Sequence, residues 1–186
     1  MAWTIFSVFR ARALSGSDRQ SKNEIARDRT DGTVTEVELT AAMRAFIGMS
    51  AGEFVPHRDP MLLIDTVVDI GAGFSLCAWE VGQSMFHDRG FGVPAYTGIE
   101  TMAQCISVHA GARARIQGLD PPMGLLLGTR HFRSSIQYFE LGRTYSVRCD
   151  VLFRDARGMS SFACELGSEG TRLATARLVV LERIPD

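Results

Sequence analysis

Hydrophobic and polar positions divide the chain into one long helical segment with strands on both sides of it. Residues 96–117 carry apolar side chains at three- and four-residue spacing, with few and small polar side chains between them, which predicts a mostly buried helix. Before it, residues 61–70 are apolar and β-branched, and residues 74–81 alternate after a turn at residues 71–73. These two segments predict a β-hairpin.

Three or four strands are expected after the long helix, in residues 123–135, 143–155, 159–168 and 171–183. Short turns separate the last three segments, which predicts an antiparallel meander. A long, nearly all-apolar helix between an early hairpin and a later meander is buried best when the sheet curls around it. The pattern therefore predicts an α+β fold of the hotdog type, in which a curled antiparallel sheet wraps around a central helix.

A short helix is expected before this domain core, at residues 35–47. Thr35 followed by Glu38 fits a capping box, which marks a helix start. Apolar side chains within the segment form a rough helical stripe, made of Val37, Ala41 and Phe46, with Leu39 and Met43 near them.

The composition is that of one globular domain. A chain of 186 residues with 46% hydrophobic and 22% charged residues is long enough for one well-buried core. Residues 1–34 become rich in Ser, Arg, Asp and Lys and have no periodic apolar face, so we expect a disordered tail there. The domain itself is expected to cover residues 35–186.

Charge and cysteine usage exclude several classes of protein. The 20 basic and 21 acidic residues are mixed along the chain, which leaves no electrostatic footprint for a nucleic-acid partner. No apolar run is long enough to span a bilayer. The cysteines lack the spacing of metal sites, so we expect no metal ion, and buried thiols typical of the reducing cytoplasm. They are Cys77, Cys105, Cys149 and Cys164.

Glu100 is the candidate catalytic acid or base. It lies in the first turn of the long helix among apolar neighbours, where burial would raise its pKa and the positive helix end would lower it. A carboxyl balanced in this way can exchange protons near pH 7. The alternative is a carboxylate that only complements the helix dipole. Gln104, one turn later on the same face, is either a hydrogen-bond partner of Glu100 or of an acyl group, or a satisfied core amide.

The entrance of the long helix is a candidate site for a thioester carbonyl. Backbone N–H groups at a positive dipole end stabilise an oxygen that gains charge, although every helix has such an end. The entrance consists of Pro94, Ala95, Tyr96, Thr97 and Gly98.

A histidine would complete an acid–base pair with Glu100, and the chain has four. His109 lies about 180° around the helix from Glu100, and His131 alternates with apolar neighbours on a predicted strand, so we expect both to be structural. His57, in a proline-bracketed loop before the first strand, and His87, in the loop before the helix, are the two candidate partners. Each is otherwise an ordinary loop histidine.

Three motifs, in order, resemble those of FabZ-type 3-hydroxyacyl-[acyl-carrier-protein] dehydratases. VPHRDPMLLIDTVV at residues 55–68 is similar to their opening motif, and GIETMAQ at residues 98–104 is similar to their catalytic helix. RHFRSSIQYFELGRTYSV at residues 130–147 resembles the strand, turn and strand that follow. The helix entrance VPAYTGIETMAQ is closer still to the ApeP-like branch, which is associated with aryl polyene biosynthesis. The resemblance covers about residues 36–183.

This resemblance implies dehydration of a (3R)-hydroxyacyl chain, carried on the phosphopantetheine arm of an acyl carrier protein, to a trans-2-enoyl thioester without metal or organic cofactor. It implies a base that takes the α-proton, an acid that protonates the departing hydroxyl, and amides near Ala95 and Tyr96 that polarise the thioester carbonyl. Gly98 and Gln104 are further expected substrate contacts. It also implies a site built across a dimer, with the histidine and Glu100 from different chains.

The loop MFHDRGFGVPA departs from the family pattern GHFPxxPxxPG, which carries the catalytic histidine. Either His87 is a displaced substitute or His57 serves; if neither does, the domain binds acyl chains without converting them. Two other functions stay open: a non-catalytic hotdog subunit paired with an active dehydratase, and an acyl thioesterase in which Glu100 activates water. A homodimer, or a heterodimer with another hotdog subunit, is expected because a hotdog sheet leaves an edge uncovered.

Overall fold

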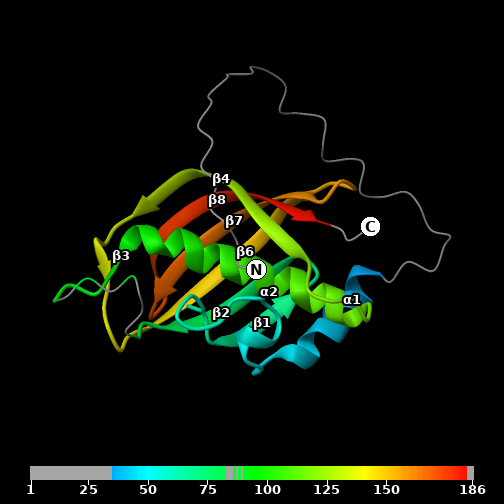
Figure 1. The fold of residues 1–186 in the computed structure, drawn as a ribbon, viewed down its shortest axis with the longest axis horizontal. Helices are drawn as coiled ribbons and strands as arrows, with labels where there is room; N and C mark the ends of the chain where they lie inside the picture. The colour runs from blue at the N-terminus through cyan, green and yellow to red at the C-terminus, as the bar shows by residue number, and fades with distance from the viewer. Residues whose placement is uncertain (1–34, 83–85, 87, 89, 184–186) are drawn as a thin grey trace, which may run out of the picture.

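The computed structural model describes residues 35–82, 86, 88 and 90–183 (Figure 1). Two subjects of the sequence predictions, the tail at residues 1–34 and His87, lie outside the described residues.

The long helix α2 spans Gly98–Ile116 and is preceded by a tight 3-10 turn, η3, at Ala95–Thr97. Most of its side chains are buried, because it packs against β2, β6 and β7 of the sheet. Figure 1 shows α2, in green, running across one face of the sheet. The predicted central helix is confirmed, with its first residues wound more tightly than an α-helix.

Six antiparallel strands of the described chain form one sheet, in the order β1-β2-β6-β7-β8-β4. The sheet is curled but not closed, since β1 and β4 lie at its two edges. A separate two-stranded ladder joins β3 to β5 beside the start of α2. The bounds are β1 Thr66–Gly71, β2 Phe74–Glu80, β3 Val93–Pro94, β4 Met123–Ser134, β5 Tyr138–Phe139, β6 Thr144–Arg154, β7 Met159–Ser168 and β8 Thr171–Arg183.

Burial alternates along β2, β7 and β8, as expected for a sheet with one face on the core. At one end of the core, three aromatic rings hold β2, β5 and β6 together near the start of α2. The ring centroids of Trp79 and Phe139 lie 4.8 Å apart, and those of Phe139 and Tyr145 lie 5.0 Å apart. The arrangement is the predicted hotdog fold.

One predicted detail is wrong, and a second is confirmed in part. The first strand begins at Thr66, because the backbone of Met61 and Leu63 bonds to the Gln104 side chain, while Asp65 N–H donates to Ala78 O of β2. The expected apolar stripe of the first helix is confirmed in part. That helix, α1, spans Glu36–Met43 and is followed by a 3-10 turn, η1, at Arg44–Phe46.

The capping box of α1 is confirmed, with the Thr35 side chain accepting from Glu38 N–H and the Glu38 carboxylate accepting from Thr35 N–H. Of the predicted stripe, Val37 is 79% exposed and Ala41 is also exposed. The other three residues of the stripe do contact the core, at three- and four-residue spacing; they are Leu39, Met43 and Phe46.

Candidate functional site

Glu100 lies in the first turn of α2 and is only 7% exposed. Burial raises the pKa of its carboxyl, and a hydrogen bond from Gln104 partly offsets that rise. A buried carboxyl is costly to charge. Glu100 is therefore a group whose protonated form is favoured more than in water.

His57 reaches Glu100 on a loop, residues 54–65, which we call the His57 loop. Two features fix this loop. The Arg58 guanidinium donates from Nη1 to the carbonyl oxygens of Val55 and His57, at 2.8 and 2.6 Å. On α2, Gly111 meets the backbone carbonyl of Phe54 so closely that no Cβ would fit. The helix and the loop can therefore cross at this point only because residue 111 has no side chain.

The crossing brings His57 and Glu100 of one chain together. His57 Nε2 lies 3.6 Å from Glu100 Oε1, and His57 is 3% exposed. Burial lowers the pKa of His57, and the nearby Arg58 charge lowers it further. An ion pair is possible at this distance, but burial shifts the two pKa values in the directions that favour a neutral imidazole beside a neutral carboxyl.

Gln104 connects Glu100 to the His57 loop. Its Nε2 donates to Glu100 Oε1 at 2.9 Å and to Met61 O at 2.7 Å, and its Oε1 accepts from Leu63 N–H at 2.9 Å. Both amide hydrogens are thus engaged within the chain. Gln104 orients Glu100, which is one of the two predicted contacts, while a contact with an acyl group stays a prediction.

The helix entrance differs from the prediction at Ala95. The Ala95 N–H donates to Gln137 O at 2.8 Å, because the β3–β5 ladder continues through Ala95, so the expectation of a free amide at this position is wrong. Gly98 N–H is also used, donating to Ala95 O. Tyr96 is 66% exposed, and its predicted role in substrate binding stays a prediction.

Gly98 is required by packing. A Cβ at this position would lie 2.8 Å from Leu166 Cδ1 and 3.3 Å from Phe139 Cζ. The start of α2 therefore rests directly on the aromatic core. A contact between Gly98 and a substrate stays a prediction.

Comparison with known proteins identifies the family of the chain. The family model of the ApeP-like proteins, described as ApeP dehydratase, matches residues 49–184. The chain belongs to the ApeP-like dehydratase family. It is also similar to the 3-hydroxyacyl-[acyl-carrier-protein] dehydratase FabZ of Teredinibacter turnerae, with 28% identity over 138 residues that cover 71% of this chain and 93% of that protein.

Two solved structures resemble this ApeP-like dehydratase. The dehydratase heterocomplex ApeI:P from Xenorhabdus doucetiae matches with a TM-score of 0.68 and 27% identity, covering 73% of this chain and 92% of that chain. Zebrafish thioesterase superfamily member 2 matches with a TM-score of 0.52 and 14% identity, covering 81% of this chain and 99% of that chain. The second likeness shows a shared fold alone.

Within one chain of this ApeP-like dehydratase, His57 and Glu100 already lie 3.6 Å apart, and the expectation that a site is built across a dimer stays a prediction. His109 is structural, as predicted: it is fully buried, and its Nε2 lies 3.1 Å from Gly71 O and 3.0 Å from Ala72 O. His131 lies on β4, also as predicted, at a bulge where its φ is +58°. His57 is therefore the one described histidine that approaches Glu100.

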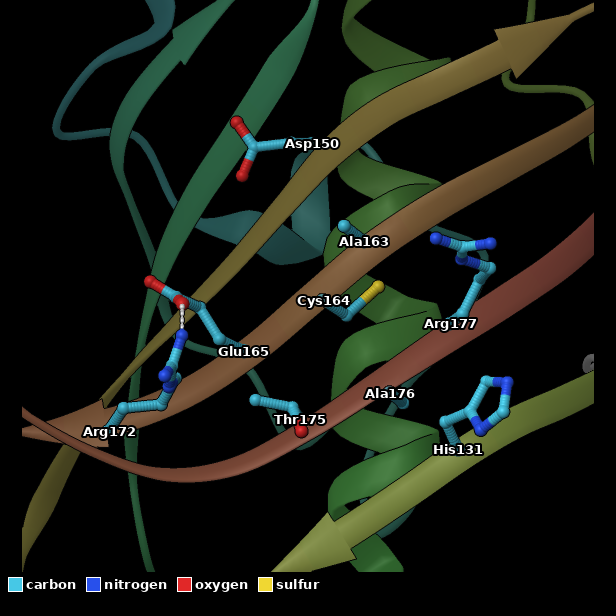
Figure 2. Close-up of a pocket in the computed structure, with 9 residues that line it drawn as sticks. All are labelled: His131, Asp150, Ala163, Cys164, Glu165, Arg172, Thr175, Ala176 and Arg177. Carbon is cyan, nitrogen blue, oxygen red and sulfur yellow. Dashed lines mark ion pairs between the residues drawn. The ribbon is translucent and has the colours of Figure 1, made fainter. Parts of the chain in front are cut away.

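A shallow hollow of about 320 Å³ lies on the opposite face of the sheet from α2. Figure 2 shows His131, Glu165, Arg172 and Arg177 on its walls, with α2 behind the strands. Arg172 and Glu165 form an ion pair of 3.9 Å across it. Since Glu100 faces the His57 loop, the hollow is separate from the acid–base pair.

Over the described ranges, no three His, Cys, Asp or Glu side chains are grouped so that they could hold a metal ion. In the same part of the chain, no helix is both long and apolar enough to cross a membrane. The four cysteines are buried free thiols.

Sequence reasoning missed two residues that build the site, Arg58 and Gly111. Arg58 could have been suspected from its place next to His57 between prolines. Gly111 has a signal of its own, because a glycine inside a helix costs about 1 kcal/mol relative to alanine and calls for a close contact. The partner in that contact, the Phe54 carbonyl, is a fact of tertiary structure.

Proposed function

We propose that this ApeP-like dehydratase converts (3R)-hydroxyacyl groups on an acyl carrier protein into trans-2-enoyl groups, with His57 and Glu100 as its acid–base pair. The observation that supports the proposal most is the approach of these two buried side chains to 3.6 Å in one chain. The aryl polyene pathway is the proposed setting, on the strength of the helix entrance VPAYTGIETMAQ, and the cytoplasm is the proposed location, in keeping with four free thiols.

The directions of the two pKa shifts favour His57 as the base and Glu100 as the acid. Neutral His57 is a base, and it takes the α-proton of the substrate. Protonated Glu100 is an acid, and it gives its proton to the 3-hydroxyl. The electron pair of the broken Cα–H bond forms the Cα=Cβ double bond, and the Cβ–O bond breaks to release water. Proton transfer from His57 to Glu100 across the short gap then restores the starting state.

Substitution of either group tests the proposal. Glu100→Gln and His57→Gln keep the size of the side chain and remove its acid–base chemistry, so we expect kcat for dehydration of a 3-hydroxyacyl thioester to fall by about 10²- to 10⁴-fold. Glu53→Gln is a matched control, because Glu53 is a half-exposed glutamate that pairs with Arg115 on the surface. Undiminished turnover by Glu100→Gln would refute the proposed function.

Mixing the two variants tests whether the pair works within one chain. If it does, a dimer of one Glu100→Gln chain and one His57→Gln chain has no intact pair and stays inactive. If each site instead used His57 of one chain and Glu100 of the other, one site of this mixed dimer would be intact and activity would return. Restored activity would therefore contradict a pair within one chain.

A dimer with a second hotdog subunit is the proposed assembly. One of the two edges of the sheet is β4, and three of its apolar side chains, Met123, Leu125 and Leu127, are exposed, as is common where a strand meets a partner. The similar protein of known structure is a heterocomplex, which favours a second candidate function, that of a subunit active only with its partner. Dehydration by the purified chain alone, compared with the reconstituted pair, separates the two.

A further inference from the structure

Within the described residues, one buried hydroxyl near the start of α2 has no hydrogen-bond partner. Thr97 is 3% exposed, and its Oγ1 makes no hydrogen bond within the described residues. The Thr97 carbonyl, by contrast, accepts from Thr101 Oγ1 at 3.2 Å. Buried hydroxyls are nearly always hydrogen-bonded, because an unmet donor costs the desolvation of the group. A valine would fill the same space without that cost, so the hydroxyl calls for a partner from outside the chain.

The position of Thr97 indicates what that partner is. Thr97, Glu100 and Gln104 are spaced by three and four residues, which puts them on one face of the helix. Glu100 and Gln104 on that face meet the His57 loop. Thr97 is one turn nearer the helix entrance, at the positive end of the helix dipole, where it would favour a partner oxygen that gains negative charge.

The proposed elimination needs such a donor. When His57 takes the α-proton, the electron pair moves into the bond to the carbonyl carbon, and the thioester oxygen gains negative charge. The Ala95 and Gly98 amides are already engaged within the chain.

We propose that Thr97 is a further catalytic residue, whose hydroxyl donates a hydrogen bond to the thioester carbonyl oxygen of the substrate. The inference rests on the proposed dehydratase function. The Thr97 hydroxyl keeps its proton throughout. Negative charge builds on the thioester oxygen, and the electron pair then forms the Cα=Cβ double bond as the Cβ–O bond breaks. The 3-hydroxyl then leaves as water with the proton of Glu100.

Thr97→Val tests this inference, because it removes the hydroxyl and keeps the shape. In the assembled dehydratase, with a 3-hydroxyacyl thioester as substrate, we expect kcat to fall about 10²-fold. We expect kcat/KM to fall by the same factor, since the bond strengthens only in the transition state. The melting temperature is expected to stay the same or to rise, because the variant no longer buries a hydroxyl that lacks a hydrogen bond. Thr97→Ser, which keeps the hydroxyl, is expected to retain most of the activity.

Thr101→Val is the matched control. It also removes a buried threonine hydroxyl from α2, but one that already has a partner, so it is expected to lower the melting temperature with little change in kcat. If Thr97→Val does not fold, Thr97→Ala supplies the same comparison with Thr97→Ser.

Three results for Thr97→Val would overturn the inference. The first is an unchanged kcat, and the second is a change confined to KM. The third is a fall in melting temperature large enough to account for the loss of activity. Parallel measurement of Glu100→Gln shows which idea has failed. If Glu100→Gln is inactive and Thr97→Val is fully active, only the role of Thr97 is wrong. If Glu100→Gln is also fully active, the proposed function itself is wrong.

Discussion

His109 is expected to make the protein less stable in mild acid, and the size of the effect follows from its surroundings. The imidazole is completely buried against the sheet, and its Nε2 lies near two backbone carbonyl oxygens, those of Gly71 and Ala72. Two acceptors at one nitrogen require that Nε2 carries the proton in the neutral ring. Burial lowers the pKa of His109 from 6.5 to about 4, so the folded protein keeps the ring neutral where the unfolded chain protonates it.

The difference of 6.5 − 4, or about 2.5 pKa units, corresponds to about 3 kcal/mol at 1.36 kcal/mol per unit. Between these two pH values the unfolded chain binds the extra proton. The free energy of unfolding therefore falls as the pH falls from 6.5 towards 4, and levels off below that. His57 adds a change of the same sign, because its pKa is also lowered. Glu100 acts in the opposite direction above pH 4.5, because its raised pKa lets the folded state keep a proton there.

A difference measurement isolates the contribution of His109. Urea unfolding of the wild type and of His109→Gln, each followed by circular dichroism from pH 7 to pH 4, gives two curves in which the other groups cancel. The variant is expected to be less stable at pH 7, and its deficit is expected to shrink by about 3 kcal/mol on going to pH 4. His131→Gln, which removes an exposed histidine from β4, serves as the control for the loss of an imidazole that is not buried. Parallel curves for the wild type and His109→Gln would refute the reasoning.

Two further results are expected. Gly111→Ala should lower the free energy of unfolding by about 1–3 kcal/mol, because its Cβ would collide with the Phe54 carbonyl. Activity should fall as well, because the collision would displace the loop that carries His57. A melting temperature at or above that of the wild type would contradict this. Initial-rate measurements of kcat/KM against pH should give a bell, with an acid limb below pH 6.5 as His57 is protonated and an alkaline limb above pH 4.5 as Glu100 ionises. An acid limb centred above pH 6.5 would show that the imidazole is not the buried, neutral base.

The parts of the fold that could be predicted from sequence are those in which local pattern and tertiary role agree. The central helix is buried on most of its sides because the sheet curls about it, and β7 and β8 alternate because one face stays exposed to solvent. The capping box of Thr35 and Glu38 depends on local contacts alone. Residues 61–65 were mispredicted because an apolar run fits a strand and a buried loop equally well, and the bonds of Met61 and Leu63 to the Gln104 side chain are made by the tertiary structure.

The candidate site also has one part that could be predicted from the sequence and another that depends on tertiary structure. Glu100 could be identified from sequence, since its place in a helical turn and its apolar neighbours are both local. The choice between His57 and His87 could not be made, because it depends on where a loop crosses a helix. Similarly, the Ala95 amide appeared free in the sequence and is occupied in the fold, because its acceptor at Gln137 comes from another segment.

An acid–base pair within one chain changes what a partner subunit can contribute. If His57 and Glu100 act together as proposed, the elimination chemistry does not depend on a residue from the second subunit. A partner would then matter by covering the β4 edge and by contacting the acyl chain. Loss of the partner should therefore change KM and stability more than the pH dependence of kcat, because that dependence belongs to two groups that the chain holds by itself.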